Sequence, residues 1–119
     1  MIEAGDSLNP LKLFEYDHDP GNYCLMLSDL DMVKVSDVFE ECGYVGNGYD
    51  WSGVARSAVR THAPEIADRL EYDPEAGTFV AHGTDPAALR RLGGLLQRAF
   101  QDGPTLATLI RTGDRDWFD

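Results

Sequence analysis

Two turn-rich segments, residues 17–22 and 73–77, each separate two short stretches that have the pattern of β-strands. The first segment is Asp-His-Asp-Pro-Gly-Asn and the second is Asp-Pro-Glu-Ala-Gly. Residues of these types favour turns because they adopt tight backbone conformations or hydrogen-bond to their own main chain. The flanking stretches, residues 11–16 with 23–28 and residues 70–72 with 78–82, are therefore predicted to form two hairpins. Two hairpins in so short a chain point to an antiparallel sheet.

Each hairpin is followed by helical patterns. Residues 29–42 are predicted to form one helix, because their apolar side chains recur at a spacing near 3.6. Gly43 follows it, as the left-handed residue that commonly ends a helix. A second helix is expected to begin with Asp50 as its N-cap. Tyr49 and Val54 would then form a hydrophobic staple.

The second half repeats this plan. Pro64 breaks the preceding helix and is expected to open one further turn. A Leu-rich helix is predicted to start at Thr84-Asp85-Pro86, and Gly93-Gly94 inside it suggests close packing. A last helix is expected from Gly103-Pro104 to about Arg111. The order ββα-α-ββα-α predicts an α+β fold, with an antiparallel sheet of about four strands and helices packed on one face.

The length of 119 residues predicts a single domain over residues 1–119, with a loose lead-in at 1–10 and a polar tail at 114–119. Cys24 and Cys42 belong to no metal-ligand or redox motif and are expected to be free thiols. The first residues lack the charged and apolar regions of a signal peptide, and no apolar run reaches the length of a membrane span. These features together predict a reduced, cytoplasmic protein.

The formal net charge is −11, and the acidity is concentrated in the first half of the chain. Residues 1–50 carry eleven acidic side chains against two lysines, whereas residues 51–119 carry ten acidic side chains against eight arginines. A negative field repels nucleic-acid backbones and anionic lipid, so neither is expected as a partner. The same field accelerates encounter with a basic protein. Acidity that serves only solubility remains an alternative explanation.

The stretch Gly43-Tyr44-Val45-Gly46-Asn47-Gly48-Tyr49-Asp50-Trp51 is the most informative in the chain. Its glycines permit unusual backbone conformations, and its aromatic rings are of the type enriched at interfaces. One interpretation is a shaped loop that recognises a partner. The other is a rigid connector in which Gly46, Gly48, Asp50 and Trp51 are structural.

No constellation for catalysis is visible. The three histidines are far apart in sequence, and no serine lies in a nucleophile-elbow context. Asp29 and Asp31 alone do not complete the oxygen shell that calcium requires. The expectation is therefore no catalytic residue, no metal and no cofactor.

The string Gly46-Asn47-Gly48-Tyr49-Asp50-Trp51, together with Leu70-Glu71-Tyr72-Asp73-Pro74-Glu75-Ala76-Gly77-Thr78-Phe79, resembles the immunity protein 51 family of bacterial polymorphic toxin systems. The strand that ends at residues 25–29, the Ala-rich helix and the Leu-rich helix agree with it, and the similarity covers roughly residues 12–111. The resemblance implies a cytosolic antidote, usually encoded beside its toxin, that binds the toxin and blocks it. It implies no catalytic residues.

The function predicted from the sequence is therefore neutralisation of a cognate toxin by stoichiometric binding and not by catalysis. The toxin is expected to be a basic protein, and a nuclease is one class that fits this expectation. The expected partner-binding residues come from the first helix region and from the loop: Asp29, Asp31, Asp37, Glu40, Glu41, Tyr44, Asn47 and Tyr49. The alternative is a small-molecule or regulatory module in which the 43–51 loop lines a pocket beside Trp51. The oligomeric state is left open.

Overall fold

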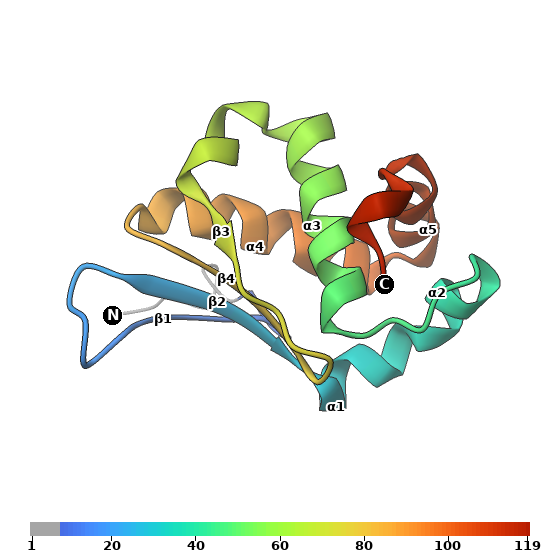
Figure 1. Ribbon diagram of the computed structural model, residues 1–119, viewed down its shortest axis with the longest axis horizontal. Helices are drawn as coiled ribbons and strands as arrows, with labels where there is room; N and C mark the ends of the chain where they lie inside the picture. Colours follow the sequence, from blue (N-terminus) through green and yellow to red (C-terminus); the bar gives the residue numbers. More distant parts are fainter. Residues whose placement is uncertain (1–7) are drawn as a thin grey trace.

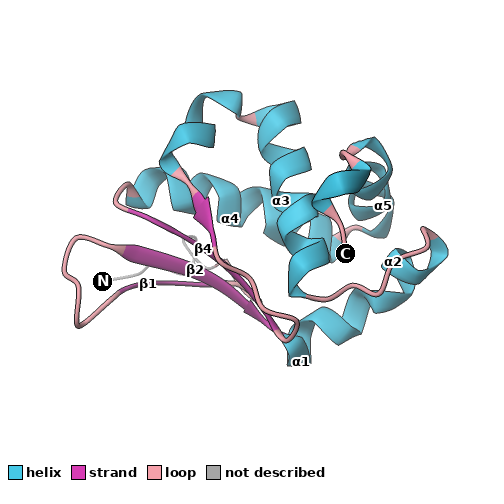
Figure 2. Cartoon of the chain, in the orientation of Figure 1, coloured by secondary structure: helices cyan, strands magenta, loops and turns pink. Residues whose placement is uncertain are grey.

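A four-stranded antiparallel sheet forms one layer of the protein, and the computed structural model describes residues 8–119 of the chain (Figures 1 and 2). Of the predicted lead-in, residues 1–7 lie outside the described residues. The strands are β1 (Lys12–Glu15), β2 (Tyr23–Ser28), β3 (Glu71–Tyr72) and β4 (Thr78–Gly83). Their order is β1-β2-β4-β3, so the second strands of the two hairpins lie side by side at the centre.

The alternation of side chains along the central strands decides which face is buried. Leu25 pairs with Ala81 and Leu27 pairs with Phe79, and all four side chains are fully buried. Their chain neighbours, such as Met26 and Val80, lie on the other face and are half-buried. One face of the sheet therefore belongs to the core, as the period of two in a strand requires.

The helices cover that face and extend beyond one end of the sheet, where α2 and α5 lie (Figure 1). The α-helices are α1 (Asp29–Met32), α2 (Ser36–Glu41), α3 (Gly48–His62), α4 (Pro86–Gln101) and α5 (Gly103–Thr112). Short 3₁₀ segments are η2 (Val33–Val35), η3 (Pro64–Arg69) and η4 (Arg115–Trp117). The predicted α+β fold, its element order and its antiparallel sheet are confirmed.

The helix predicted over residues 29–42 is not continuous. It divides into α1, η2 and α2 because Val35 has φ −123° and ψ 16°, outside the helical region. The predicted inward face is retained, since Met32 and Phe39 are buried. Gly43 follows with φ +90°, which confirms the left-handed termination.

The Leu-rich helix α4 begins as predicted. The carboxylate of Asp85 accepts hydrogen bonds from the backbone N–H groups of Ala87 and Ala88, and Pro86 is the first helical residue. Close packing at the two glycines is confirmed only for Gly93, where a Cβ would lie 2.7 Å from Cδ1 of Leu8. A Cβ on Gly94 would meet no described atom within 4 Å.

Candidate recognition surface

Asp50 organises the loop that joins α2 to α3. Its side chain is fully buried, and its Oδ2 accepts hydrogen bonds from the backbone N–H groups of Gly46 (2.8 Å) and Val45 (3.2 Å). Its Oδ1 accepts a third, from the backbone N–H of Asp119 at 2.9 Å. A buried carboxylate must be satisfied by such donors. The result is a loop folded around one acidic side chain.

The prediction that Asp50 is the N-cap of α3 is wrong. The cap is Asn47, which has extended backbone and whose Oδ1 accepts the N–H of Asp50 at 2.9 Å. Tyr49 therefore lies inside the first turn, is 42% exposed, and does not form the predicted staple with the buried Val54. Both Asn and Asp are good caps, and here Asp50 is turned back into the loop.

The two segments that carry the family resemblance meet in space. Gly48 donates its N–H to the carbonyl of Ala76, and a Cβ on Gly48 would lie 1.9 Å from the carbonyl oxygen of Glu75. Gly46 has φ +88°, and a Cβ there would lie 3.0 Å from the ring of Phe39. The close approach at Gly48 therefore fixes the start of α3 against the β3–β4 turn, and the one at Gly46 sets the loop against Phe39 of α2.

The aromatic residues of the loop have different roles. Trp51 is fully buried between Phe39 and Phe100, with ring centroids 5.5 and 6.4 Å away. Tyr44 is half-buried and stacks on Phe118 at 4.9 Å. Tyr49 is the loop aromatic that is most open to solvent. The two tyrosines therefore differ, because the Tyr44 ring is engaged with Phe118 whereas the Tyr49 side chain is exposed.

The last residues of the chain pack onto this loop, which the sequence did not indicate. A Cβ on Gly53 would lie 2.8 Å from the ring of Phe118, so that ring sits directly on α3. The guanidinium of Arg60 lies 4.7 Å from the ring centre of Trp117. The side-chain amide of Asn47 donates to the carboxylate of Asp119 at 2.8 Å. The sequence feature that could have indicated this packing is the presence of two large aromatic residues, Trp117 and Phe118, in an otherwise polar tail.

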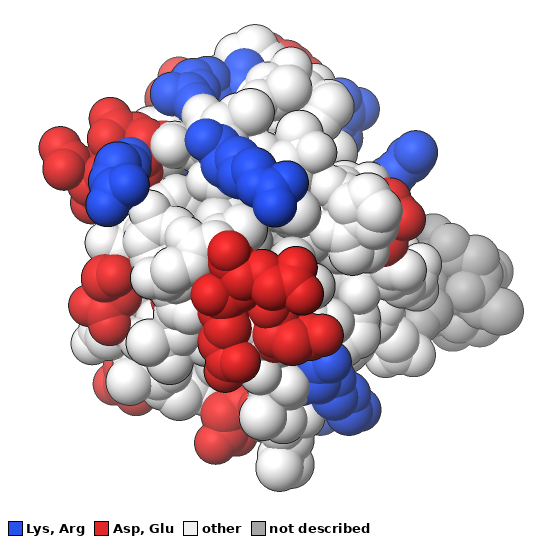
Figure 3. Space-filling model, turned by 90° about the vertical axis from the view of Figure 1, so that its right-hand side faces the viewer, with Lys and Arg blue, Asp and Glu red and all other residues white. Residues whose placement is uncertain are grey.

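The helical segment α1–α2 presents an acidic face to solvent, which we define as Asp29, Leu30, Val33, Asp37, Glu40 and Glu41, all exposed. Figure 3, which faces this end of the molecule, shows one group of acidic side chains near the centre, basic side chains above it and at its lower right, and further acidic side chains towards the left. Asp31 is half-buried and forms an ion pair with Lys34 at 3.1 Å. The acidic residues of this face were predicted from the sequence, but its apolar residues were not. Leu30 is 76% exposed and Val33 is 65% exposed.

A shallow hollow of about 360 Å³ lies beside Tyr49, between the start of α3, the β3–β4 turn and η4. Ser52 lines it, and its buried Oγ has no hydrogen-bond partner among residues 8–119. Trp51 does not line this hollow. The alternative function requires a pocket beside Trp51. In the structure the rings of Phe39 and Phe100 pack against the buried Trp51 side chain.

The pKa values of one cysteine and two tyrosines are raised, which does not activate these groups as nucleophiles. Burial raises the pKa of the Cys24 thiol, which disfavours the reactive thiolate. A hydrogen bond with Cys24 raises the pKa of Tyr16 to about 12, and burial raises that of Tyr72 to about 12. Within residues 8–119, no group of three or more His, Cys, Asp or Glu side chains is arranged to hold a metal ion. No helix in the same range is long and apolar enough to cross a membrane.

The comparisons with known proteins give one match. The family model for immunity protein 51 matches residues 11–115, which includes the loop and the β3–β4 turn and ends at the first residue of η4. No curated protein and no solved structure matches the chain. Because the match covers most of the sequence, the chain belongs to the immunity protein 51 family.

Proposed function

We propose that this protein binds a cognate bacterial toxin domain and neutralises it by stoichiometric contact, without catalysis. Membership of an immunity protein family supports a toxin as the partner. The partner-binding surface that we propose is the acidic face of α1–α2, extended by Tyr49 at the start of α3.

The observation that carries this proposal is the exposure of Leu30 and Val33 among acidic side chains. Residues three or four apart share one side of a helix, so Leu30 and Val33 lie close together. Asp37, Glu40 and Glu41 continue along the same segment. Protein interfaces typically combine a few apolar anchors, which provide affinity, with charged rims, which set the association rate.

We divide the residues proposed from the sequence by their exposure and contacts. Asp29, Asp37, Glu40, Glu41 and Tyr49 are exposed and remain proposed contacts. Tyr44 and Asn47 are engaged with the tail, and Asp31 is paired with Lys34, so we assign them a positioning role.

The toxin that fits this surface carries a basic region with an apolar recess. A nuclease is the class that we favour, because a groove that binds nucleic acid is positively charged. The net charge of −11 supports a basic protein partner over nucleic acid or anionic membrane. We place the encounter in the cytoplasm.

The test uses the toxin domain encoded by the reading frame next to this gene. Co-expression of this protein should rescue growth, and size-exclusion chromatography with light scattering should show a fixed-ratio complex of the two chains. Rescue at protein levels far below those of the toxin, without a complex, would instead indicate catalytic removal of the toxin.

The interface is tested with the double variant Leu30→Ala/Val33→Ala. It should weaken toxin binding by at least tenfold, because anchor side chains carry most of the binding energy. The matched control is Phe14→Ala, which removes an apolar side chain of 41% exposure from β1. Equal affinities of the double variant and the control would place the toxin elsewhere on the protein.

A further inference from the structure

A groove of about 630 Å³ lies between α3, α4 and α5, at residues that the proposed toxin-binding surface does not include. Ala58, Leu95 and Leu109, one from each helix, provide apolar lining. The volume is within the range of small-molecule sites, which lies at about 300–1,000 Å³. The residues of α5 that line it run from Pro104 to Thr112, a length of about 12 Å at the helical rise of 1.5 Å per residue. The groove therefore accommodates a small ligand but not a long helix.

The threonines of α5 make this groove more apolar than their residue type suggests. The hydroxyl of Thr108 donates to the carbonyl of Pro104 at 2.9 Å, and that of Thr112 donates to the carbonyl of Thr108 at 2.8 Å. The hydroxyl of Thr105 donates to the carboxylate of Asp102. Because these hydroxyl hydrogens are engaged within the α4–α5 region, the three threonines have none to offer a ligand.

The groove also has a cation in its lining. Arg98 lines it, is exposed, and forms no hydrogen bond or ion pair with any of residues 8–119. Two nearby arginines differ from it: Arg60 donates to the carbonyl of Thr112, and Arg91 donates to the carbonyl of His62. The exposed His62 side chain also lines the groove. An unengaged guanidinium beside apolar side chains is matched by a carboxylate or sulfonate, because such anions accept two parallel hydrogen bonds from it.

We propose that this groove binds a small anionic amphiphile, a molecule with an apolar body and a single carboxylate or similar acidic group. The apolar body lies against Ala58, Leu95 and Leu109, and the anionic group pairs with Arg98. The inference does not depend on the toxin, because it rests on the groove and its charge alone.

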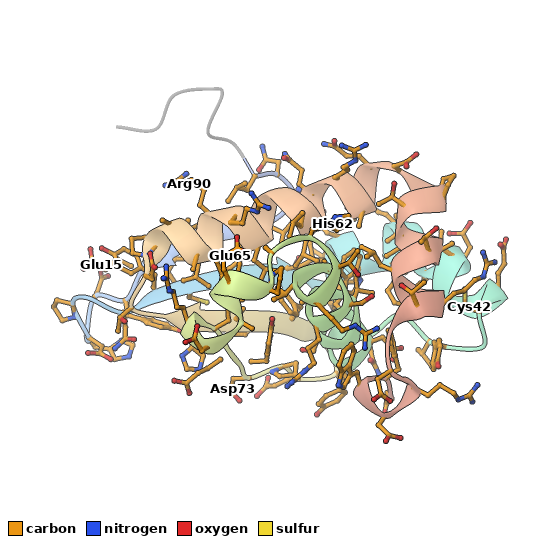
Figure 4. All side chains as sticks on the ribbon, turned by 90° about the horizontal axis from the view of Figure 1, so that it is seen from above. Glu15, Cys42, His62, Glu65, Asp73 and Arg90 are labelled. Carbon is orange, nitrogen blue, oxygen red and sulfur yellow. The ribbon has the colours of Figure 1, made fainter. Side chains whose placement is uncertain are left out.

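The test measures binding of the fluorescent probe anilinonaphthalene sulfonate, an anionic amphiphile, and its displacement by decanoate. Arg98→Ala should lower the affinities for the probe and for decanoate by about tenfold each, the value expected for one charged hydrogen-bonded pair. The matched control is Arg90→Ala, which removes the same charge from the same helix. Figure 4 shows Arg90 projecting from the side of α4 that faces away from α3. This control should change the affinity by less than twofold.

Two substitutions at Thr108 test the position of the site. Thr108→Phe should block the groove and abolish probe binding, whereas Thr108→Val keeps the shape and should bind as the parent does. Circular dichroism checks that each variant is folded, and methyl NMR should show shifts at Leu95 and Leu109 on titration with decanoate.

The proposal fails if Arg98→Ala and Arg90→Ala weaken binding equally, since the effect would then be one of overall charge. It also fails if Thr108→Phe binds the probe as the parent does, or if dodecyltrimethylammonium, a cationic amphiphile, binds as tightly as decanoate. The absence of any saturable probe binding to the parent protein overturns it outright.

Discussion

The carboxylate of Asp50 accepts the backbone N–H of Asp119 at 2.9 Å, across 69 positions of the chain. The same carboxylate binds the N–H groups of Val45 and Gly46, so one buried side chain connects the α2–α3 loop to the C-terminal segment. The position of Tyr49, which we propose contacts the toxin, depends on this arrangement because Tyr49 is the residue before Asp50.

Replacement of Asp50 by alanine should cost about 3 kcal/mol in the free energy of unfolding, because one buried and two part-buried N–H groups lose their acceptor. Urea denaturation measures the change. Asn47→Ala, which removes the N-cap of α3, is the comparison and should cost about 1 kcal/mol. A loss at Asp50 no larger than that at Asn47 would show that water replaces the carboxylate.

Gly53→Ala should displace the C-terminal segment, because the new Cβ would lie 2.8 Å from the ring of Phe118. We expect a loss of about 1–3 kcal/mol, as for other overpacked positions. Gly94→Ala is the control, and with open space around it, it should stabilise the helix by about 0.5–1 kcal/mol. In the double variant Gly53→Ala/Phe118→Ala, the two losses should be less than additive, since the clash is absent without the ring.

Asp85 should make stability depend on pH in the acid range. The N–H of Ala88, followed by the side chain of Arg69, holds the pKa of Asp85 below its ordinary value of 3.8. A lowered pKa in the folded state stabilises the protein above the unfolded-state pKa, and this contribution is lost as the pH falls through the folded-state value. Asp85→Asn should therefore reduce stability at pH 7 and flatten its decline below pH 4, as measured by urea denaturation at each pH. Arg69→Ala should give a smaller effect in the same direction, and parallel curves for Asp85→Asn and the parent protein would exclude this linkage.

Charge reversal on the acidic face should slow association with the toxin. Glu40→Lys/Glu41→Lys is expected to lower the association rate at low salt and to flatten its dependence on salt between 50 and 500 mM, over which the Debye length falls roughly threefold. Stopped-flow or surface-based kinetics measure this. Glu65→Lys/Glu71→Lys changes the net charge equally on η3 and β3, and should have a weaker effect. An association rate of the parent protein that does not respond to salt would contradict electrostatic steering.

The parts of the fold that the sequence predicted are those fixed by local chemistry. The turns before Tyr23 and Thr78 contain turn-forming residues, and the helix boundaries at Gly43, Pro64 and Asp85 follow from backbone preferences that act within a few residues. These boundaries could be predicted because no distant contact is needed to produce them.

The errors arose where distant contacts decide the structure. Asn47 and Asp50 are equally suitable N-caps in isolation, and in the structure Asp50 instead accepts from Val45, Gly46 and the distant Asp119. The exposure of Leu30 and Val33 follows from which side of a divided helix faces the core. The docking of Phe118 depends on the space above Gly53, and such a space is visible only once α3 is packed.

The connection between the loop and the C-terminal segment has a consequence for the timing of synthesis. A chain leaves the ribosome from its N-terminus at about 5–20 residues per second, so the strands and the acidic face emerge well before residue 118. Until Phe118 and Asp119 are available, Tyr44 lacks its stacking partner and Asp50 lacks its third donor. The helical part of the proposed toxin-binding surface is thus made early, whereas the loop beside it acquires its final shape only after residues 118 and 119 have been translated.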